Sequence, residues 1–248
     1  MRTDNSRRPT DMMLLVNSDL FAHMLSQWPY QSGKVLARVV SGENDVERLQ
    51  VRVELGILQM EVVGHPEGAV PIYESMKETP QDLDEPTCLA LQREAALYAY
   101  RAFILSVLER HAGVVKDMAR NLAVMSLIIN AANSEVDRGR ARSLTVQFLM
   151  IRARSRAAFA ASRGDFSLAR RTLESDMEEI REGLHQAGRA SDVENAPEIQ
   201  LLKGMRDMFV PRLPSSQRQE MEERLAAAID VENYELAAIL RNELRQLF

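Results

Sequence analysis

The sequence predicts a mainly α-helical protein made of antiparallel helical hairpins, with an N-terminal third that mixes helix and strand signals. Beyond residue 87, apolar residues recur at the three- and four-residue spacing of amphipathic helices, and short Gly- or Pro-containing turns separate these stretches. Short turns between long helices imply antiparallel neighbours. The 248 residues are 46% hydrophobic and 27% charged with a net charge of −5, which excludes wholesale disorder and a strongly basic nucleic-acid coat.

The N-terminal region, residues 1–63, has no function that its sequence identifies. Its first helix is expected at residues 20–28, after the capping residues Asn17, Ser18 and Asp19 and before Pro29. The β-branched run at 35–40 is typical of a short strand.

Residues 46–63 fit two structures. Leu49, Val51, Val53, Leu55 and Ile57 alternate as in a strand, yet the apolar residues also fall on two faces of a helix. Eighteen residues is long for a strand, and the ends of the segment resemble helix caps. We therefore favour a helix that is buried on two faces, with a strand as the alternative.

Residues 64–86 are predicted to be a linker, because Gly64, Gly68, Pro71, Pro80 and Pro86 punctuate a mostly polar stretch. A scaffold of helical hairpins is predicted at 87–214. The apolar stripe of its first helix is expected at Leu89, Ala96, Leu97, Tyr100, Phe103, Ile104, Val107 and Leu108. Further helices are expected near 115–129, 144–163, 166–184 and 196–210.

Two hairpin turns in the sequence resemble each other. Gly164-Asp165-Phe166-Ser167-Leu168-Ala169 echoes Glu232-Asn233-Tyr234-Glu235-Leu236-Ala237. Asp165 and Asn233 are expected to cap the second helix of each hairpin, and the aromatic residue that follows is expected to wedge against the first helix. The hairpins at 88–130 and 141–184 loosely resemble those of tetratricopeptide-like proteins, on Ala158, Gly164, Asp165, Phe166 and Ala169.

Charge is segregated within the scaffold. Residues 138–171 hold nine Arg and one acid, whereas residues 174–182 hold five acids and one Arg. The basic stretch, with Arg152, Arg156 and Arg163, is a candidate face for anions or nucleic acid. The favoured interpretation is a solvated face whose Arg side chains pair with acidic runs, because aromatic residues interleaved for base stacking are missing.

The last segment, residues 215–248, predicts two short helices that share one narrow apolar seam. A capping box at Ser216 and Gln219 opens the first helix. A hairpin of this size has too small a core to stand alone, so it is expected to dock on its own body, a second copy or a partner. The predicted docking residues are Met221, Leu225, Ala228, Tyr234, Ala237, Leu240, Arg241, Leu244 and Leu247.

This segment resembles the UVR domain (UvrB/UvrC motif), a helical hairpin of bacterial excision-nuclease subunits. The resemblance rests on Tyr234, Glu235, Ala237, Ala238, Leu240, Arg241, Glu243 and Leu244 at fixed spacing, preceded by Met221, Leu225 and Ala228. It covers about 31 residues and implies a protein–protein contact element in a bacterial protein. Asn242 departs from the usual Asp, and nothing upstream resembles those subunits, so a role in DNA repair is an analogy only.

The sequence offers no constellation for catalysis, metal or cofactor binding. His23, His65, His111 and His185 do not pair at ligand spacing, and Cys88 is expected to be a structural thiol. No transmembrane or targeting segment is recognised, and a cytoplasmic location is expected. The favoured function is a non-enzymatic adaptor that binds a protein partner or a second copy through 216–248. The alternatives are a nucleic-acid-associated repair accessory and an enzyme with its site in 15–70.

Overall fold

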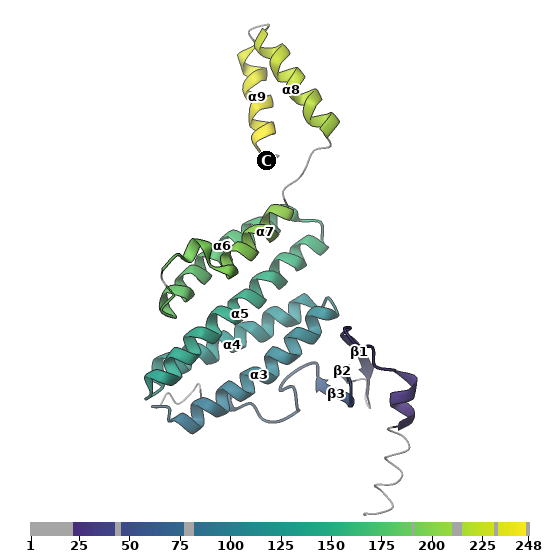
Figure 1. Ribbon diagram of the computed structural model, residues 1–248, viewed down its shortest axis with the longest axis vertical. Coiled ribbons are helices and arrows are strands. Elements are labelled where there is room, and N and C mark those ends of the chain that lie inside the picture. Colours follow the sequence, from purple (N-terminus) through teal and green to yellow (C-terminus); the bar gives the residue numbers. More distant parts are fainter. Residues whose placement is uncertain are drawn as a thin grey trace, which may run out of the picture. The chain divides into compact units, whose positions relative to one another are not determined.

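The computed structural model describes residues 22–42, 46–76, 82–189, 191–209, 215–230 and 233–246, with only the backbone at 215–219 and 245–246 (Figure 1). The protein is mainly α-helical with a small antiparallel sheet, as the sequence predicted. Its contacts divide the chain into two units, residues 1–138 and 139–248. The expected boundary at 64–86 therefore lies inside the first unit.

The sheet of the first unit corrects the helix favoured for residues 46–63. Strands β1 (Leu36–Ser41), β2 (Glu47–Val53) and β3 (Gly56–Glu61) pair antiparallel in that order. The pairs Leu49–Met60 and Val51–Leu58 place apolar side chains on one face. Since a two-residue turn at 54–55 resets the alternation, the apolar residues of the two strands together imitate a helical spacing. The β-branched run at 35–40 lies largely in β1.

Residues 22–27 are helical, within the expected range 20–28, and the proposed caps at 17–19 lie outside the described residues. The central strand holds this segment in place, because Arg52 Nε donates to the Trp28 carbonyl at 2.7 Å. The Arg38 guanidinium lies 4.2 Å from the centre of the Trp28 ring. The only tryptophan of the chain is thus fixed against the sheet.

The segment expected to be a linker is bound to the helices where the structure describes it. Residues 61–76, here called the strap, leave β3 through a turn closed by hydrogen bonds from Glu61 N to Pro66 O and from Gly68 N to His65 O. Gly64 and Gly68 have φ near +75°, which favours glycine. The strap ends in the short helix α2 (Ile72–Met76). Its N–H groups meet helical side chains, so it is not a free connection.

Helices α3 (Glu85–Val107) and α4 (His111–Ala131) form the hairpin beneath the strap. The buried face of α3 is formed by Cys88, Leu91, Ala95, Tyr98, Ala102 and Leu105. Tyr100, Phe103 and Val107 of the predicted stripe are exposed. The predicted stripe was therefore largely wrong, because α3 carries apolar residues on two faces and spacing alone does not say which one is covered.

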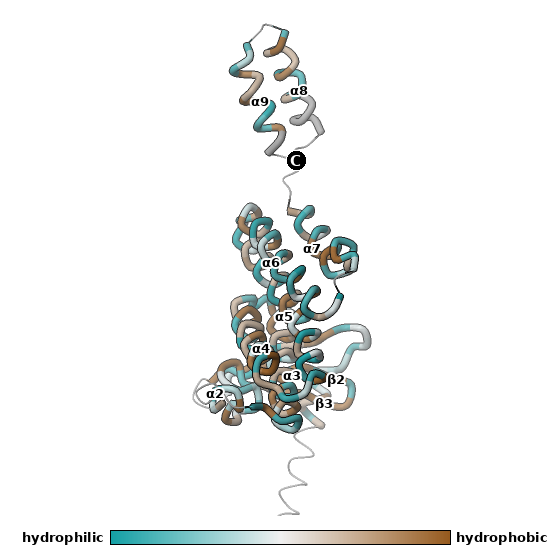
Figure 2. Tube along the Cα trace, turned by 90° about the vertical axis from the view of Figure 1, so that its left-hand side faces the viewer, coloured by the Kyte–Doolittle hydropathy of each residue, from teal (hydrophilic) through white to brown (hydrophobic). Residues whose placement is uncertain are grey.

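Helix α5 (Glu135–Ser162) begins in the first unit and continues into the second, where α6 (Phe166–Gln186), the 3₁₀ turn η2 (Val193–Asn195) and α7 (Pro197–Met208) follow. Gly183 of α6 lets α5 come close, since an added Cβ would lie 3.4 Å from Val146 and Leu149 side chains. Hydrophobic and hydrophilic residues alternate along α6 and α7, as in amphipathic helices (Figure 2).

Helices α8 (Ser215–Asp230) and α9 (Tyr234–Gln246) form the C-terminal hairpin (Figure 1). Its turn repeats that of α5 and α6, as the sequence echo predicted. Asp165 N donates to Ala160 O and Asn233 N donates to Ala228 O, five residues back in each case. The side chains of Asp165 and Asn233 accept from Leu168 N and Leu236 N, so both cap the second helix.

The aromatic residues of the two turns do not wedge against the first helix as expected. Phe166 is about half exposed and stacks on Phe209 at the end of α7, with ring centroids 6.1 Å apart. Tyr234 is 68% exposed. The small residues at the third following position, Ala169 and Ala237, are buried.

Candidate functional site

The interior of the C-terminal hairpin is filled by its own seam residues. Ala228 of α8 packs with Ala237 and Leu240 of α9, and Met221 and Leu225 lie against this cluster. Leu244 is buried as well. These residues were predicted to dock a partner, but in the described hairpin they hold α8 and α9 together. Leu247 and the side chains of the predicted capping box at 216 and 219 lie outside the described residues.

The outer surface of the hairpin carries a second set of apolar residues. Ile229, Leu236 and Ile239 are 41–51% exposed, and Tyr234 is more exposed still. At 100° per residue, Leu236 and Ile239 lie on one side of the α9 seam together with Glu243. Tyr234 and Arg241, which the sequence did single out, lie on the other side, and both are exposed. The sequence prediction missed Leu236 and Ile239 because it took one apolar stripe per helix.

The arginine-rich face at 138–171 is partly neutralised within the second unit. Arg152 Nη2 lies 2.6 Å from Glu179 Oε2, and Arg156 Nη1 lies 2.5 Å from Asp176 Oδ1. Asp176 is almost fully buried, and burial raises the pKa of its carboxyl although the two guanidinium groups oppose this shift. Arg152 and Arg156 therefore pair with the acidic run 174–182, the pairing favoured from the sequence.

Arg163 differs from these two residues. It is exposed at the turn after α5, and its guanidinium lies 5.6 Å from the centre of the Phe159 ring. Among the described residues, no carboxylate forms an ion pair with it. The three arginines proposed as one anion face thus split into two paired residues and one exposed residue.

A buried charge cluster in the first unit was not found by sequence reasoning. Arg101 of α3 and Asp117 of α4 form two contacts, Nη2–Oδ1 at 2.6 Å and Nε–Oδ2 at 2.9 Å. The remaining terminal nitrogen, Nη1, donates to the carbonyls of Glu61 and Gly64 in the strap. One guanidinium therefore joins both helices to the strap.

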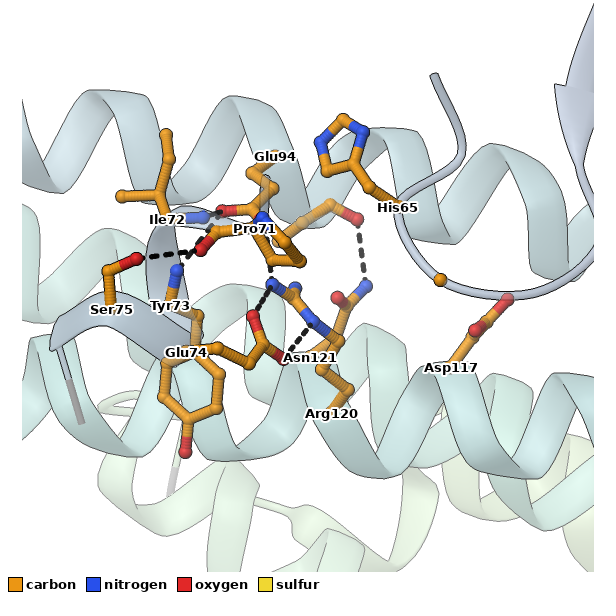
Figure 3. Close-up of polar contacts among 12 residues, drawn as sticks. His65, Pro71, Ile72, Tyr73, Glu74, Ser75, Glu94, Asp117, Arg120 and Asn121 are labelled. Carbon is orange, nitrogen blue, oxygen red and sulfur yellow. Dashed lines mark hydrogen bonds and ion pairs between the residues drawn. The ribbon is translucent and has the colours of Figure 1, made fainter. Parts of the chain in front are cut away.

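Glu94 and Arg120 extend this cluster toward α2 (Figure 3). Glu94 accepts from Ile72 N at 3.0 Å and from Tyr73 N at 3.3 Å, which places a carboxylate at the N-terminus of α2. Arg120 pairs with both Glu94 and Glu74. Its guanidinium also lies 3.8 Å from the centre of the Tyr98 ring, and burial raises the pKa of the Tyr98 hydroxyl. No sequence signal points to these partners, which lie 21–46 residues apart.

These contacts consist of structural ion pairs and hydrogen bonds. Cys88 is buried, and burial raises the pKa of its thiol, as in a structural cysteine. Within the part of the chain that the structure describes, no three His, Cys, Asp or Glu residues gather as a metal site would require. No helix of the described residues is long and apolar enough to cross a membrane.

Comparison with known proteins identifies one segment of the chain. Residues 215–247 match the model of the UvrB/uvrC motif family, which covers α8 and α9. Searches of curated proteins and of solved structures found no match to this chain. The matched segment is the hairpin that the sequence singled out by its spacing.

Proposed function

We propose that this chain is a non-enzymatic adaptor whose C-terminal hairpin binds a protein partner. The observation that carries the proposal is the second set of apolar residues, Ile229, Tyr234, Leu236 and Ile239. They remain exposed although the seam between α8 and α9 is already filled. Exposed Tyr and aliphatic residues that neighbours do not cover are typical of protein interfaces.

The family match supports a protein–protein contact over other uses of this hairpin. The α9 face with Leu236 and Ile239 also carries Glu243, so it combines apolar and acidic groups. Such a mixed face suits a protein surface that offers apolar and basic side chains. The proposal includes a bacterial setting, which the family match supports. It also includes a cytoplasmic one, which the single cysteine supports because it can form no disulfide within the chain.

A double variant of the outer face tests this proposal. Leu236→Asp with Ile239→Asp removes the apolar surface and leaves the seam residues in place. Asn242→Asp is the matched control, because Asn242 is exposed on the same helix. We expect the double variant to lose the proteins that co-purify with the full chain, while the control retains them. Equal recovery from all three proteins would exclude docking through this face.

The second candidate function is a nucleic-acid-associated repair accessory that uses the arginine-rich face. Exposed Arg163 supports it, and the pairing of Arg152 and Arg156 with acidic residues weakens it. The adaptor is therefore the better supported of the two.

A further inference from the structure

On one edge of the α5–α6 hairpin, two ion pairs join the helices, and this row of pairs, here called the ladder, ends before the turn. Arg152 pairs with Glu179, and Arg156 pairs with Asp176. A step of four residues along α5 thus corresponds to three residues in the opposite direction on α6, because the helices are antiparallel. At the spacing of this helical stripe, the next positions are Phe159 on α5 and Arg163 in the turn after it, with buried Thr172 and exposed Leu168 on α6. The ladder therefore continues with a cation but without an acid.

Three side chains at the end of the ladder, Phe159, Arg163 and Leu168, are exposed. Phe159 and Leu168 are each 43% exposed, although both are apolar. The Arg163 guanidinium lies over the Phe159 ring, and Arg163 is exposed to solvent. We call Phe159, Arg163 and Leu168 the basic edge. The basic edge is an apolar surface with one cation, and no carboxylate of α6 pairs with that cation.

The C-terminal hairpin offers the complementary surface. Leu236, Ile239 and Glu243 lie at positions i, i+3 and i+7 of α9, and all three are exposed. They present two apolar side chains and one carboxylate along about 10 Å of helix. This pattern matches the two apolar groups and one guanidinium of the basic edge, and Glu243 would extend the row formed by Asp176 and Glu179.

We propose that the basic edge of one copy receives α9 of a second copy, in a reciprocal exchange between two chains. This inference rests on the proposed docking function of the hairpin and names its partner surface. Each copy carries both surfaces, so an exchange satisfies both at once and closes as a two-fold dimer.

The test is a charge swap followed by mixing, with the mass of the full chain measured by sedimentation over a concentration series. Arg163→Glu and Glu243→Arg should each weaken dimerisation at least tenfold, because like charges then meet at both contacts. When the two variants are mixed, the exchange brings the altered residues together at one contact and leaves the native pair at the other. The mixture should therefore dimerise as the unaltered chain does. Arg171→Glu, an exposed arginine outside the edge, is the matched control and should change nothing.

Several results would overturn this inference. A chain that stays monomeric at every concentration excludes the exchange. A dimer that both variants lose and that mixing does not restore shows that Arg163 and Glu243 do not meet across two copies. A dimer that Arg163→Glu leaves intact indicates another surface such as hairpin against hairpin. If the Leu236 and Ile239 variant still loses its partners in these cases, the adaptor proposal stands alone. If that variant also changes nothing, both proposals fail.

Discussion

Arg101 and Asp117 form a two-point ion pair whose side chains are each only 4% exposed. The same guanidinium donates to two carbonyls of the strap, so each of its three nitrogens has a hydrogen-bond partner. Arg110 and Glu47 make a pair of the same two-point form, but their side chains are 40% and 47% exposed. The two pairs differ mainly in their access to water.

The buried pair should matter far more to stability than the exposed pair. Asp117→Ala leaves a guanidinium buried without its carboxylate, and we expect the free energy of unfolding of the first unit to fall by about 3–5 kcal/mol. Glu47→Ala should cause only a small fraction of that loss. Urea unfolding followed by Trp28 fluorescence reports on this unit. Similar losses for the two variants would contradict this account.

The strap should open more often when the Glu94 carboxylate of α3, which accepts its hydrogen bonds, is removed. Glu94→Ala removes the acceptor of Ile72 N and Tyr73 N, so hydrogen exchange at these two amides should accelerate about tenfold or more. Glu94→Gln keeps a carbonyl oxygen at the same place and should accelerate exchange less. Unchanged protection in Glu94→Ala would show that other contacts hold the strap.

Nucleic-acid binding should not depend on Arg152 and Arg156, because acidic residues already neutralise them. Replacing both with Ala should leave any binding of duplex DNA at low salt within about twofold of the unaltered chain. Asp176→Asn with Glu179→Gln frees both cations and should raise the affinity, with a steeper salt dependence. Loss of substantial DNA binding on replacement of Arg152 and Arg156 would favour the repair accessory instead.

Acid should weaken the second unit partly through Glu194. Hydrogen bonds from Arg181 and then Lys203 lower the pKa of this carboxyl from 4.5 to about 2. Because the pKa is lower in the folded state, the stability that Glu194 adds is fully present above pH 4.5 and is lost as the pH falls toward 2. The melting temperatures of Glu194→Gln and the unaltered chain should therefore converge over this range. A constant difference between pH 6 and pH 2 would contradict the shift.

The sequence predicted the order of the scaffold helices and the capped turns because these depend on local signals. Asp165 and Asn233 stand in similar local patterns, and both make equivalent backbone and side-chain hydrogen bonds. The helix predicted for 46–63 was wrong because a two-residue turn within the segment shifts the phase of the alternation. Periodicity over the whole segment cannot separate that arrangement from a helix.

The contacts between distant residues were beyond sequence reasoning. Arg101 reaches Asp117 on the next helix and Gly64 in the strap, and nothing local distinguishes it from the exposed Arg93 on the same helix. For the hairpin, spacing found the seam that α8 and α9 share. It did not separate the residues that close the hairpin from Leu236 and Ile239, because burial depends on which face the first helix covers.

The most direct test of the adaptor proposal compares the full chain with a chain that ends at Pro214, in a quantitative pull-down. We expect the full chain to retain partner proteins, including copies of itself, and the shortened chain to lose them while keeping the helical circular dichroism of its scaffold. Recovery of the same proteins in the same amounts by both chains would contradict docking through the C-terminal hairpin.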